Sequence, residues 1–265
     1  MRIVTWNINS VRLRADLFER LSQWLAPDVI CLQETKVVNE LFPTKVFETL
    51  GYPHIAHAGM KSYNGVAIIS KFPLENVSTR SFCEREDCRH IMAHVAGPVA
   101  FDLHCLYIPA GGDIPDPIEN KKFAHKLEFL DEAAAWFPTH TDPARPAMLV
   151  GDLNIAPLPT DVWSHKQLLS VVSHTPIEVE KLGILQRSAR FTDAVRHFVP
   201  ADQKLYSWWS YRNRDWAASD RGRRLDHIWV SPELVPDLTE AEIHRPLRGW
   251  EKASDHVPVT VTFGG

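Results

Sequence analysis

The segment AMLVGDLNIAP, residues 147–157, begins as an apolar run and then places two polar side chains close together. Asp152 and Asn154 directly follow the run that ends at Gly151. A carboxylate at the end of a buried strand loses hydration free energy unless it has a partner. Either Asp152 is a turn residue capped by the local backbone, or it has a partner of functional importance.

Polar residues stand at the ends of several other apolar runs. These are Asn7, Glu34, Tyr107, Asp226 and the Ser254–His256 group. Each alone could be a cap or turn residue, but a rigid sheet presents a site by placing such groups together at its edge. Carboxylate and amide oxygens suit Mg²⁺, which keeps water molecules that a substrate phosphate can replace. We therefore expect Asp152 to contact a metal ion or its water.

The chain has 13 histidines, but H-E-x-x-H and paired Cys/His spacings are missing, so the sequence does not indicate a zinc site. Most histidines, such as His54, His94 and His140, fit ordinary surface or core positions. His256 is the exception. It follows Asp255 directly and precedes the last apolar run, where it could act as a general acid or base or stabilise phosphate charge.

Apolar periodicity predicts mixed β-sheets with helices outside them. The expected strands are residues 2–6, 28–33, 65–70, 91–95, 99–108, 146–151, 225–230 and 256–263. Helical spacing predicts helices over 11–25, with Leu13, Leu17, Leu21 and Leu25 on one face, and over 119–136. Many strands are too closely spaced for pure βαβ crossovers. With no linker-like stretch, we expect one domain over 1–265.

Composition indicates an ordinary globular protein. Of 265 residues, 45% are hydrophobic, which is enough for a substantial core. The four cysteines lack C-x-x-C spacing, so we expect them to be reduced. We predict a cytoplasmic location, because neither a signal peptide nor an apolar run of about 20 residues is recognisable. We also predict a monomer. The net charge of −4 argues against a general polyanion binder.

Charge is nevertheless uneven along the chain. Residues 211–224, YRNRDWAASDRGRR, carry five arginines against two aspartates, with a tryptophan between them. Such a segment could follow a phosphate backbone, or it could be only a solvated loop.

Seven ordered motifs resemble the exonuclease III family of DNA repair nucleases, within the endonuclease/exonuclease/phosphatase superfamily. They are TWNINSVR (5–12), DVICLQETK (28–36), YNGVAIISK (63–71), VGDLNIAP (150–157), YSWWSYR (206–212), RRLDHIWVS (223–231) and SDHVPV (254–259). The resemblance covers 1–263. It implies an α/β four-layer sandwich of two packed, mostly antiparallel sheets flanked by helices, with the site at one end of the sheets.

The resemblance also implies roles for individual residues. Glu34 resembles the principal metal ligand, with Asn7 in support and Asp255 nearby. Mg²⁺ is the expected ion, with Mn²⁺ as a substitute.

Asp152 resembles the residue that orients or deprotonates the attacking water, and Asn154 resembles its neighbour, which binds the phosphate or the water. His256 paired with Asp226 resembles the group that holds the scissile phosphate. Tyr107 resembles the phenol at the phosphate or leaving oxygen.

The implied substrate is double-stranded DNA with 3′ ends, nicks or abasic sites. Trp208 and Trp209 resemble an aromatic wall for a deoxyribose; the alternative is a pair of buried strand residues without a function. We also expect substrate contacts from Lys36, Arg89 and Arg212.

Two departures from the family pattern bear on which DNA substrate the protein prefers. Ala110 stands where well-known members carry an amide side chain. Trp163 and His165 add bulk that could narrow the pocket for a flipped abasic sugar. These residues favour work at 3′ ends over incision at abasic sites, unless they face solvent or core.

Three functions follow as hypotheses. The first is a Mg²⁺-dependent nuclease and phosphatase at DNA 3′ ends, with incision at abasic sites as a lesser or as the main activity. The second is a phosphatase of lipid or inositol phosphates. The third is a DNA-binding scaffold without catalysis, which the complete set of polar residues disfavours.

Overall fold

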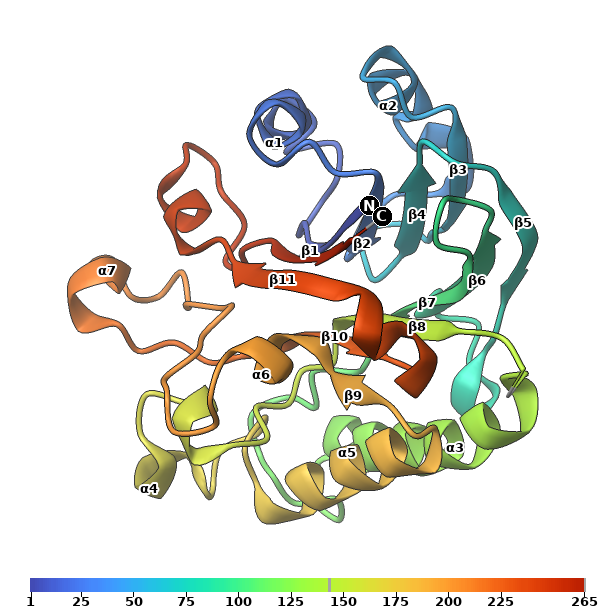
Figure 1. The fold of residues 1–265 in the computed structure, drawn as a ribbon. Coiled ribbons are helices and arrows are strands. Elements are labelled where there is room, and N and C mark those ends of the chain that lie inside the picture. Colours follow the sequence, from blue (N-terminus) through green and yellow to red (C-terminus); the bar gives the residue numbers. More distant parts are fainter. Residues whose placement is uncertain (143, 265) are drawn as a thin grey trace.

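A computed structural model describes residues 1–142 and 144–264 as two stacked β-sheets between layers of helices (Figure 1). Within these residues each sheet has six strands. The first sheet, in spatial order, contains β11 (Leu238–Ile243), β12 (Val259–Phe263), β1 (Arg2–Asn7), β2 (Val29–Gln33), β4 (Val66–Ser70) and β3 (His54–Ala58). The second contains β5 (Leu74–Thr79), β6 (His90–Val95), β7 (Phe101–Tyr107), β8 (Ala147–Asp152), β10 (Asp226–Val230) and β9 (Thr192–Asp193).

Both sheets are mixed and mostly antiparallel. β1 pairs with β2, and β7 with β8, in parallel, whereas the other pairs are antiparallel. β1 and β12 bring the two ends of the chain together (Figure 1). The expected α/β sandwich of mixed sheets is therefore confirmed.

Helices cover the outer faces of the sheets. α1 (Leu17–Leu25) and α2 (Thr44–Thr49) cover the first sheet, and α3 (Lys121–His140) and α5 (Pro176–Ser188) cover the second. The shorter helices are α4 (His165–Leu168), α6 (Ala194–Phe198) and α7 (Trp216–Ser219). Of these, α6 contributes Ala194 and Val195 to the core between the sheets, and α7 has no buried residue. Phe18 of α1 and Phe47 of α2 pack on the first sheet beside Trp6. Phe129 of α3 and Leu182 of α5 pack on the second sheet. Together with the two sheets these helices form the four layers that the family resemblance implied.

Strand alternation decides which residues face the space between the sheets. In β1, Ile3 belongs to the core between the sheets, whereas Val4 and Trp6 pack toward α1. In β8, Met148 and Val150 belong to the same inner core. Because side chains alternate with period two, Asn7 and Asp152 continue these inner rows at the ends of their strands.

The predicted helix over 11–25 is wrong in its first part. Residues 11–16 form turns, and α1 begins only at Leu17. Asn9 and Ser10 have positive φ values of 47° and 87°, which bend the chain before a helix can start. Leu13, expected on the buried face, is 59% exposed. Leu17, Leu21 and Leu25 are buried as expected.

The predicted helix over 119–136 is observed as α3, which extends to His140. The Asn120 side chain caps it by accepting a hydrogen bond from the Lys122 backbone N–H. The sequence analysis missed α5, although Thr175 and Glu178 form a capping box with Pro176 at the first helical turn.

Strands β3, β5, β9 and β11 were also missed. All four strands lie at the edges of the sheets, so each is paired on one side only. Edge strands can carry polar, exposed residues, as β5 does at every position after Leu74. Apolar periodicity therefore gave no signal for them. All four cysteines are free thiols, as expected. Among the described residues, the longest helix lacks the apolar stretch that crossing a bilayer requires.

Two buried histidines pack together on the outer face of the second sheet. His90 Nε2 and His104 Nδ1 lie 3.0 Å apart, beneath Trp136 and Phe137. Burial lowers the pKa of His104 to about 4, and burial together with the charge of His104 lowers the pKa of His90 well below its ordinary value. Both imidazoles are therefore neutral in the folded protein at neutral pH.

We expect the free energy of unfolding to fall as the pH drops from about 6.5 toward 4. In this window the unfolded chain binds protons on these histidines and the folded chain does not, so acid favours unfolding. Each such group contributes a slope of about 1.4 kcal/mol per pH unit. Urea titrations of the wild type and of His104→Gln at several pH values measure the slope. The prediction fails if the variant retains the full wild-type slope.

Candidate active site

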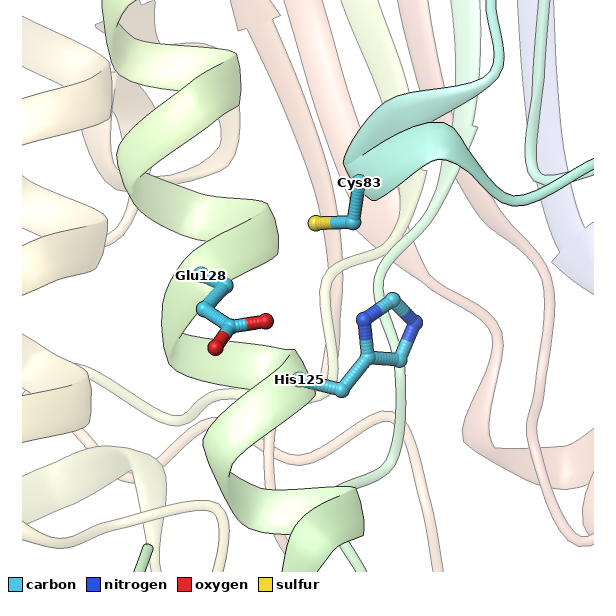
Figure 2. Close-up of side chains that lie close together, drawn as sticks. All are labelled: Cys83, His125 and Glu128. Atoms are coloured by element: carbon cyan, nitrogen blue, oxygen red, sulfur yellow. The ribbon is translucent and has the colours of Figure 1, made fainter.

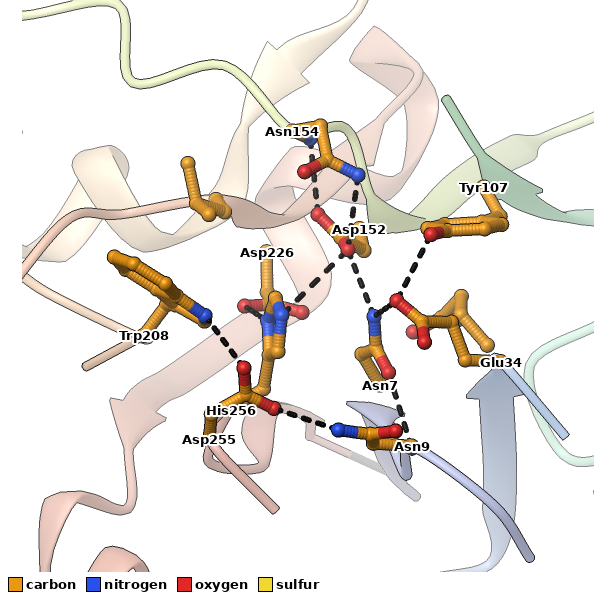
Figure 3. A network of polar contacts seen from close by, with 12 residues as sticks. Asn7, Asn9, Glu34, Tyr107, Asp152, Asn154, Trp208, Asp226, Asp255 and His256 are labelled. Atoms are coloured by element: carbon orange, nitrogen blue, oxygen red, sulfur yellow. Dashed lines mark hydrogen bonds and ion pairs between the residues drawn. The ribbon is translucent and has the colours of Figure 1, made fainter. Parts of the chain in front are cut away.

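The ends of three neighbouring strands bring Tyr107, Asp152 and Asp226 into one row. β7 and β8 pair Tyr107 with Asp152, and β8 and β10 pair Asp152 with Asp226. The parallel pairing of β1 with β2 places Asn7 beside Gln33 in the other sheet, directly before Glu34. All these strands end at one edge of the sandwich, where Figure 3 shows the side chains facing one another.

The amide of Asn7 links carboxylates that come from different sheets. Its Nδ2 donates to Glu34 Oε1 at 2.9 Å and to Asp152 Oδ2 at 2.8 Å. The Tyr107 hydroxyl donates to Glu34 Oε1 at 2.8 Å. Asn7 has no exposed surface and Asp152 is 1% exposed. These hydrogen bonds hold the two carboxylates at a defined separation inside the protein.

His256 lies between Asp226 and Asp152 (Figure 3). Its Nδ1 is 2.8 Å from Asp226 Oδ2, and its Nε2 is 3.7 Å from Asp152 Oδ2. Ser207 donates to the same Asp226 oxygen at 2.6 Å. Because Nδ1 is held by Asp226, Nε2 is the nitrogen that faces the site.

The pKa values of His256 and Asp152 are both raised, but for different reasons. Burial disfavours the charged imidazole, but Asp226 and Asp152 outweigh it and raise the pKa of His256 to about 10. Burial raises the pKa of Asp152 to about 7; Asp226 and Glu34 act in the same direction, whereas the His256 charge and the Asn7 amide oppose it. The imidazole is therefore positively charged at neutral pH.

Asn154 fixes the loop after β8. It adopts a left-handed conformation with φ 54°. Its backbone N–H donates to Asp152 Oδ1 at 2.9 Å, and its Nδ2 donates to Asp152 Oδ2 at 3.1 Å and to the Ile108 carbonyl. Below this loop the buried Lys126 ammonium donates to the Asn154 carbonyl at 2.8 Å and pairs with Glu178 at 2.5 Å.

Asp255 is the residue directly before His256. Its Oδ2 accepts a hydrogen bond from Trp208 Nε1 at 2.9 Å, and its Oδ1 accepts one from Asn9 Nδ2 at 3.1 Å. Asn9 also accepts from Lys36 Nζ at 2.6 Å. The structure therefore brings together all eight residues that were expected to be catalytic or metal-binding.

Sequence reasoning missed Asn9, Ser207 and Lys126. Asn9 follows Asn7 by two residues in the first motif, and Ser207 precedes Trp208, so both had a positional signal. Lys126 had none, because it lies in an ordinary helical pattern and reaches the site only through the packing of α3 on the second sheet.

The expected substrate-binding residues fall into different environments. Lys36 Nζ is 2.7 Å from Glu34 Oε2. The Arg89 guanidinium pairs with Asp87 and lies 4.8 Å from the centre of the Tyr107 ring. Both are therefore next to the site.

A hollow lies beside Trp208, lined by aromatic and cationic side chains. Its walls include Trp163, Trp208, Arg212, Arg221 and Arg223. A second hollow is lined by Tyr107, Arg89 and Ala110, and Gly112 lines both. Trp208 therefore borders an open hollow whose lining suits a ligand with aromatic and anionic parts.

Trp209 and His165 do not fit the roles expected for them. Trp209 is 1% exposed, and its Nε1 donates to Asp220, so the ring has no free face for a deoxyribose. His165 does not line either hollow, and its Nδ1 faces His174 Nε2 at 2.8 Å. Each side chain is turned away by a hydrogen bond that its motif did not reveal.

The arginine-rich segment 211–224 is only partly exposed to solvent. Arg212, Arg214 and Arg221 are exposed. Arg224 is buried, with its Nε 2.8 Å from Asp161 Oδ1 and its Nη1 2.7 Å from Asp193 Oδ2. Arg223 donates to Val172 and Ser173. Three of the five arginines are thus free to meet a ligand, and the other two hold the loop.

The donor set around Glu34 fits a hard divalent cation. The candidate ligand atoms are carboxylate and amide oxygens of Glu34, Asn7 and Asp255. The half-buried Glu34 and the buried Asp152 are two carboxylates joined by one amide, a negative centre that a dication would offset. Asp152, Asp226 and His256 also lie within ligand distance of each other, but His256 Nδ1 already bonds Asp226, which leaves this group better suited to proton handling.

Comparison with known proteins identifies the family. The profile of the Endonuclease/Exonuclease/phosphatase family matches residues 4–256. The chain is 31% identical to exodeoxyribonuclease III of Haemophilus influenzae, over 99% of this chain and all of that protein.

Two solved structures are similar over their whole length. An AP endonuclease from Archaeoglobus fulgidus has a TM-score of 0.92 and 31% identity, with both chains fully covered. The 3′-5′ exonuclease NExo from Neisseria meningitidis has a TM-score of 0.91 and 28% identity, also with both chains fully covered. Metal binding is general in this family. With its sandwich fold and the complete set of polar residues at one edge, the chain belongs to the endonuclease/exonuclease/phosphatase family and, within it, to the exonuclease III-like DNA repair nucleases.

Proposed function

We propose that this protein hydrolyses phosphoester bonds at the 3′ ends of double-stranded DNA, with Mg²⁺ as its metal. The observation that carries this proposal is the series of polar contacts at one edge of the sandwich. Asp226 is hydrogen-bonded to His256, His256 forms an ion pair with Asp152 at 3.7 Å, and the Asn7 amide donates to both Asp152 and Glu34. Phosphodiester hydrolysis needs a placed water, neutralised phosphoryl oxygens and donors directed at the transition state, and this series can supply each.

Asp152 orients the attacking water and accepts its proton. Its two oxygens are held by Asn7 and by Asn154, so the carboxylate cannot rotate away from the site. His256, charged and oriented by Asp226, donates from Nε2 to the phosphate and offsets the charge that develops there. Tyr107 contributes its hydroxyl at the phosphate or leaving oxygen.

Glu34 and Asn7, with Asp255 nearby, would hold the metal ion. When bound, Mg²⁺ neutralises phosphoryl oxygens and lowers the barrier to attack, and Mn²⁺ can replace it. Burial alone would raise the pKa of Glu34, but the charge of Lys36, the hydrogen bonds from Asn7 and Lys36 and the charge of His256 together outweigh it and lower the pKa. These contacts keep the Glu34 carboxylate ionised.

DNA is the favoured substrate over a lipid or inositol phosphate. The hollow beside Trp208 combines two tryptophans with exposed arginines, which suits stacked bases or sugars together with backbone phosphates. A protein from Neisseria with the same fold was solved as a 3′ phosphatase with a product DNA hairpin. The intact polar set argues against a scaffold without catalysis.

We further propose that residues 1–265 form one catalytic domain, since strands from both ends of the chain share the inner core. A monomer located in the cytoplasm stays a prediction from the sequence.

Incision at abasic sites is the second candidate activity, favoured by the similarity to the Archaeoglobus AP endonuclease. Ala110 and Trp163 argue for 3′ ends as the main substrate. Ala110 lines the hollow next to Tyr107 without offering an amide, and Trp163 adds bulk to the other hollow. An internal lesion needs more backbone contacts and a wider pocket than a free terminus.

Activity should require a divalent metal and Glu34. We expect the wild type with Mg²⁺ to process a 3′-phosphate at a nick and a recessed 3′-hydroxyl, and to leave an inositol phosphate untouched. Glu34→Ala should lose at least about a hundredfold in rate at low Mg²⁺, because the phosphate charge is then less well offset. Circular dichroism checks folding of the variant. Full activity in excess EDTA contradicts the metal hypothesis.

Asp152 and His256 should act as one unit. We expect Asp152→Asn and His256→Asn each to cost about a thousandfold or more in kcat, and the double variant to cost little more, because they serve one water and one phosphate. Single-turnover rates on the 3′-phosphate duplex measure this. Losses that add independently contradict the shared role. If Asp152 is only a turn residue, its variant loses stability and keeps its chemistry.

Substrate preference should shift with Ala110. We expect the wild type to remove a 3′-phosphate faster than it cuts a duplex with an internal abasic analogue. Ala110→Asn should raise abasic incision by about tenfold, since one hydrogen bond to a charged group contributes roughly 1.5–3 kcal/mol. His165→Gly is the matched control and should change neither rate. A wild type that cuts abasic DNA faster than it trims 3′ ends refutes this preference.

A further inference from the structure

A second cluster of potential metal ligands lies outside the active site. Cys83 belongs to the 3₁₀ helix Phe82–Glu84, and His125 and Glu128 belong to α3. One ligand atom from each lies within 4.8 Å of the others, and Figure 2 shows the three side chains converging between the helix and the turn. His125 and Glu128 share a helix face because they are three residues apart.

His125 has no hydrogen-bond partner in the part of the chain that the structure describes. Its side chain is buried at 6% exposure, and both ring nitrogens are inaccessible and unpartnered there. The nearest acidic atom to Nε2, Asp87 Oδ2, is 3.9 Å away, which is too long for a hydrogen bond. A buried imidazole without a partner costs free energy, so this ring has an unfilled requirement for a ligand.

We propose that Cys83, His125 and Glu128 form a binding site for Zn²⁺. A thiolate, an imidazole and a carboxylate are the three ligand types that zinc takes in proteins, whereas Mg²⁺ avoids sulfur and nitrogen. Tetrahedral coordination at zinc bond lengths sets ligand atoms about 3.5 Å apart, so the cluster needs to close by no more than about 1.3 Å on binding. Three protein ligands leave the fourth position to water.

The surroundings provide a route of entry and a supporting carboxylate. His125 lines the hollow that also contains Tyr107 and Arg89, so part of the ring borders this hollow although both of its nitrogens are covered; a small movement of the side chains would admit an ion. Asp87 lies on the Nε2 side of His125 and can accept its proton when the other nitrogen binds metal, as carboxylates beside zinc-binding histidines do. Asp87 also pairs with Arg89, so the bound ion would tie the 83–89 segment to α3.

Coordination replaces the S–H bond of Cys83 with an S–Zn bond and releases the proton to solvent. Burial, with the carboxylates of Glu132 and Glu128, raises the pKa of this thiol to about 11. The thiol is therefore protonated and unreactive when no ion is bound, unlike the activated cysteines of redox enzymes.

Cobalt is a suitable probe because thiolate-bound Co²⁺ absorbs through sulfur-to-metal charge transfer, and an oxygen-only site does not. The full-length protein is titrated with Co²⁺ in excess Mg²⁺, and then with Zn²⁺. We expect one Co²⁺ per chain with a charge-transfer band, which an equimolar amount of Zn²⁺ removes. Zn²⁺ should also raise the melting temperature.

Variants separate this site from the remaining thiols. Cys83→Ser should abolish the band, and Glu128→Gln, at an exposed position that tolerates change, should weaken Co²⁺ binding at least about tenfold. Cys88→Ser is the matched control, because Cys88 is also half-buried and lies five residues away, and it should retain the band. A wild type without the band, a band that survives Cys83→Ser, or one lost in Cys88→Ser overturns the proposal. None of these readouts depends on nuclease activity.

Discussion

The amide of Asn7 is the contact on which the active site depends, because it ties one carboxylate from each sheet to a single side chain. Both of its N–H groups are used, one for Glu34 and one for Asp152. β1 is an inner strand of the first sheet, held by β12 on one side and β2 on the other. A one-residue slip of β1 would turn Asn7 to the outer face and separate the two halves of the site.

Negative charge is concentrated at this edge of the sandwich, and the protein offsets it locally. Glu34, Asp152 and Asp226 are carboxylates within a few hydrogen bonds of each other, and Asp226 has no exposed surface. The positive charges of His256 and Lys36 face them. Such an arrangement is costly for folding, and its value lies in holding charge and hydrogen-bond donors ready for the reaction.

Buried ion pairs support the loops around the site. Lys126 and Glu178 join α3 to α5 beneath the loop that carries Asn154. Arg224 and Asp161 anchor the arginine-rich segment, whose exposed Arg212 and Arg221 line the hollow. The side chains of these pairs are almost completely buried. Their effect is to keep loops rigid at places where the chain leaves the sheets and backbone hydrogen bonds end.

The sequence by itself determined the strands of the inner core and the identity of the polar residues at their ends. This was possible because strand alternation and apolar runs are local signals, and Asn7, Tyr107, Asp152 and Asp226 each end or begin such a run. Edge strands such as β5 and the early turns before α1 carried no apolar signal, and so were missed. Motif resemblance supplied the layer order, which periodicity alone does not specify.

Only the tertiary structure decided which side chains meet. Trp208 and Trp209 are adjacent in the sequence, yet one lines a hollow and the other is buried against Asp220, because neighbouring residues in an extended chain face opposite sides. The approach of Cys83 to His125 depends on how α3 packs against a turn some forty residues earlier in the chain. Contacts between distant segments are set by packing, and no local pattern in either segment encodes the distance between them.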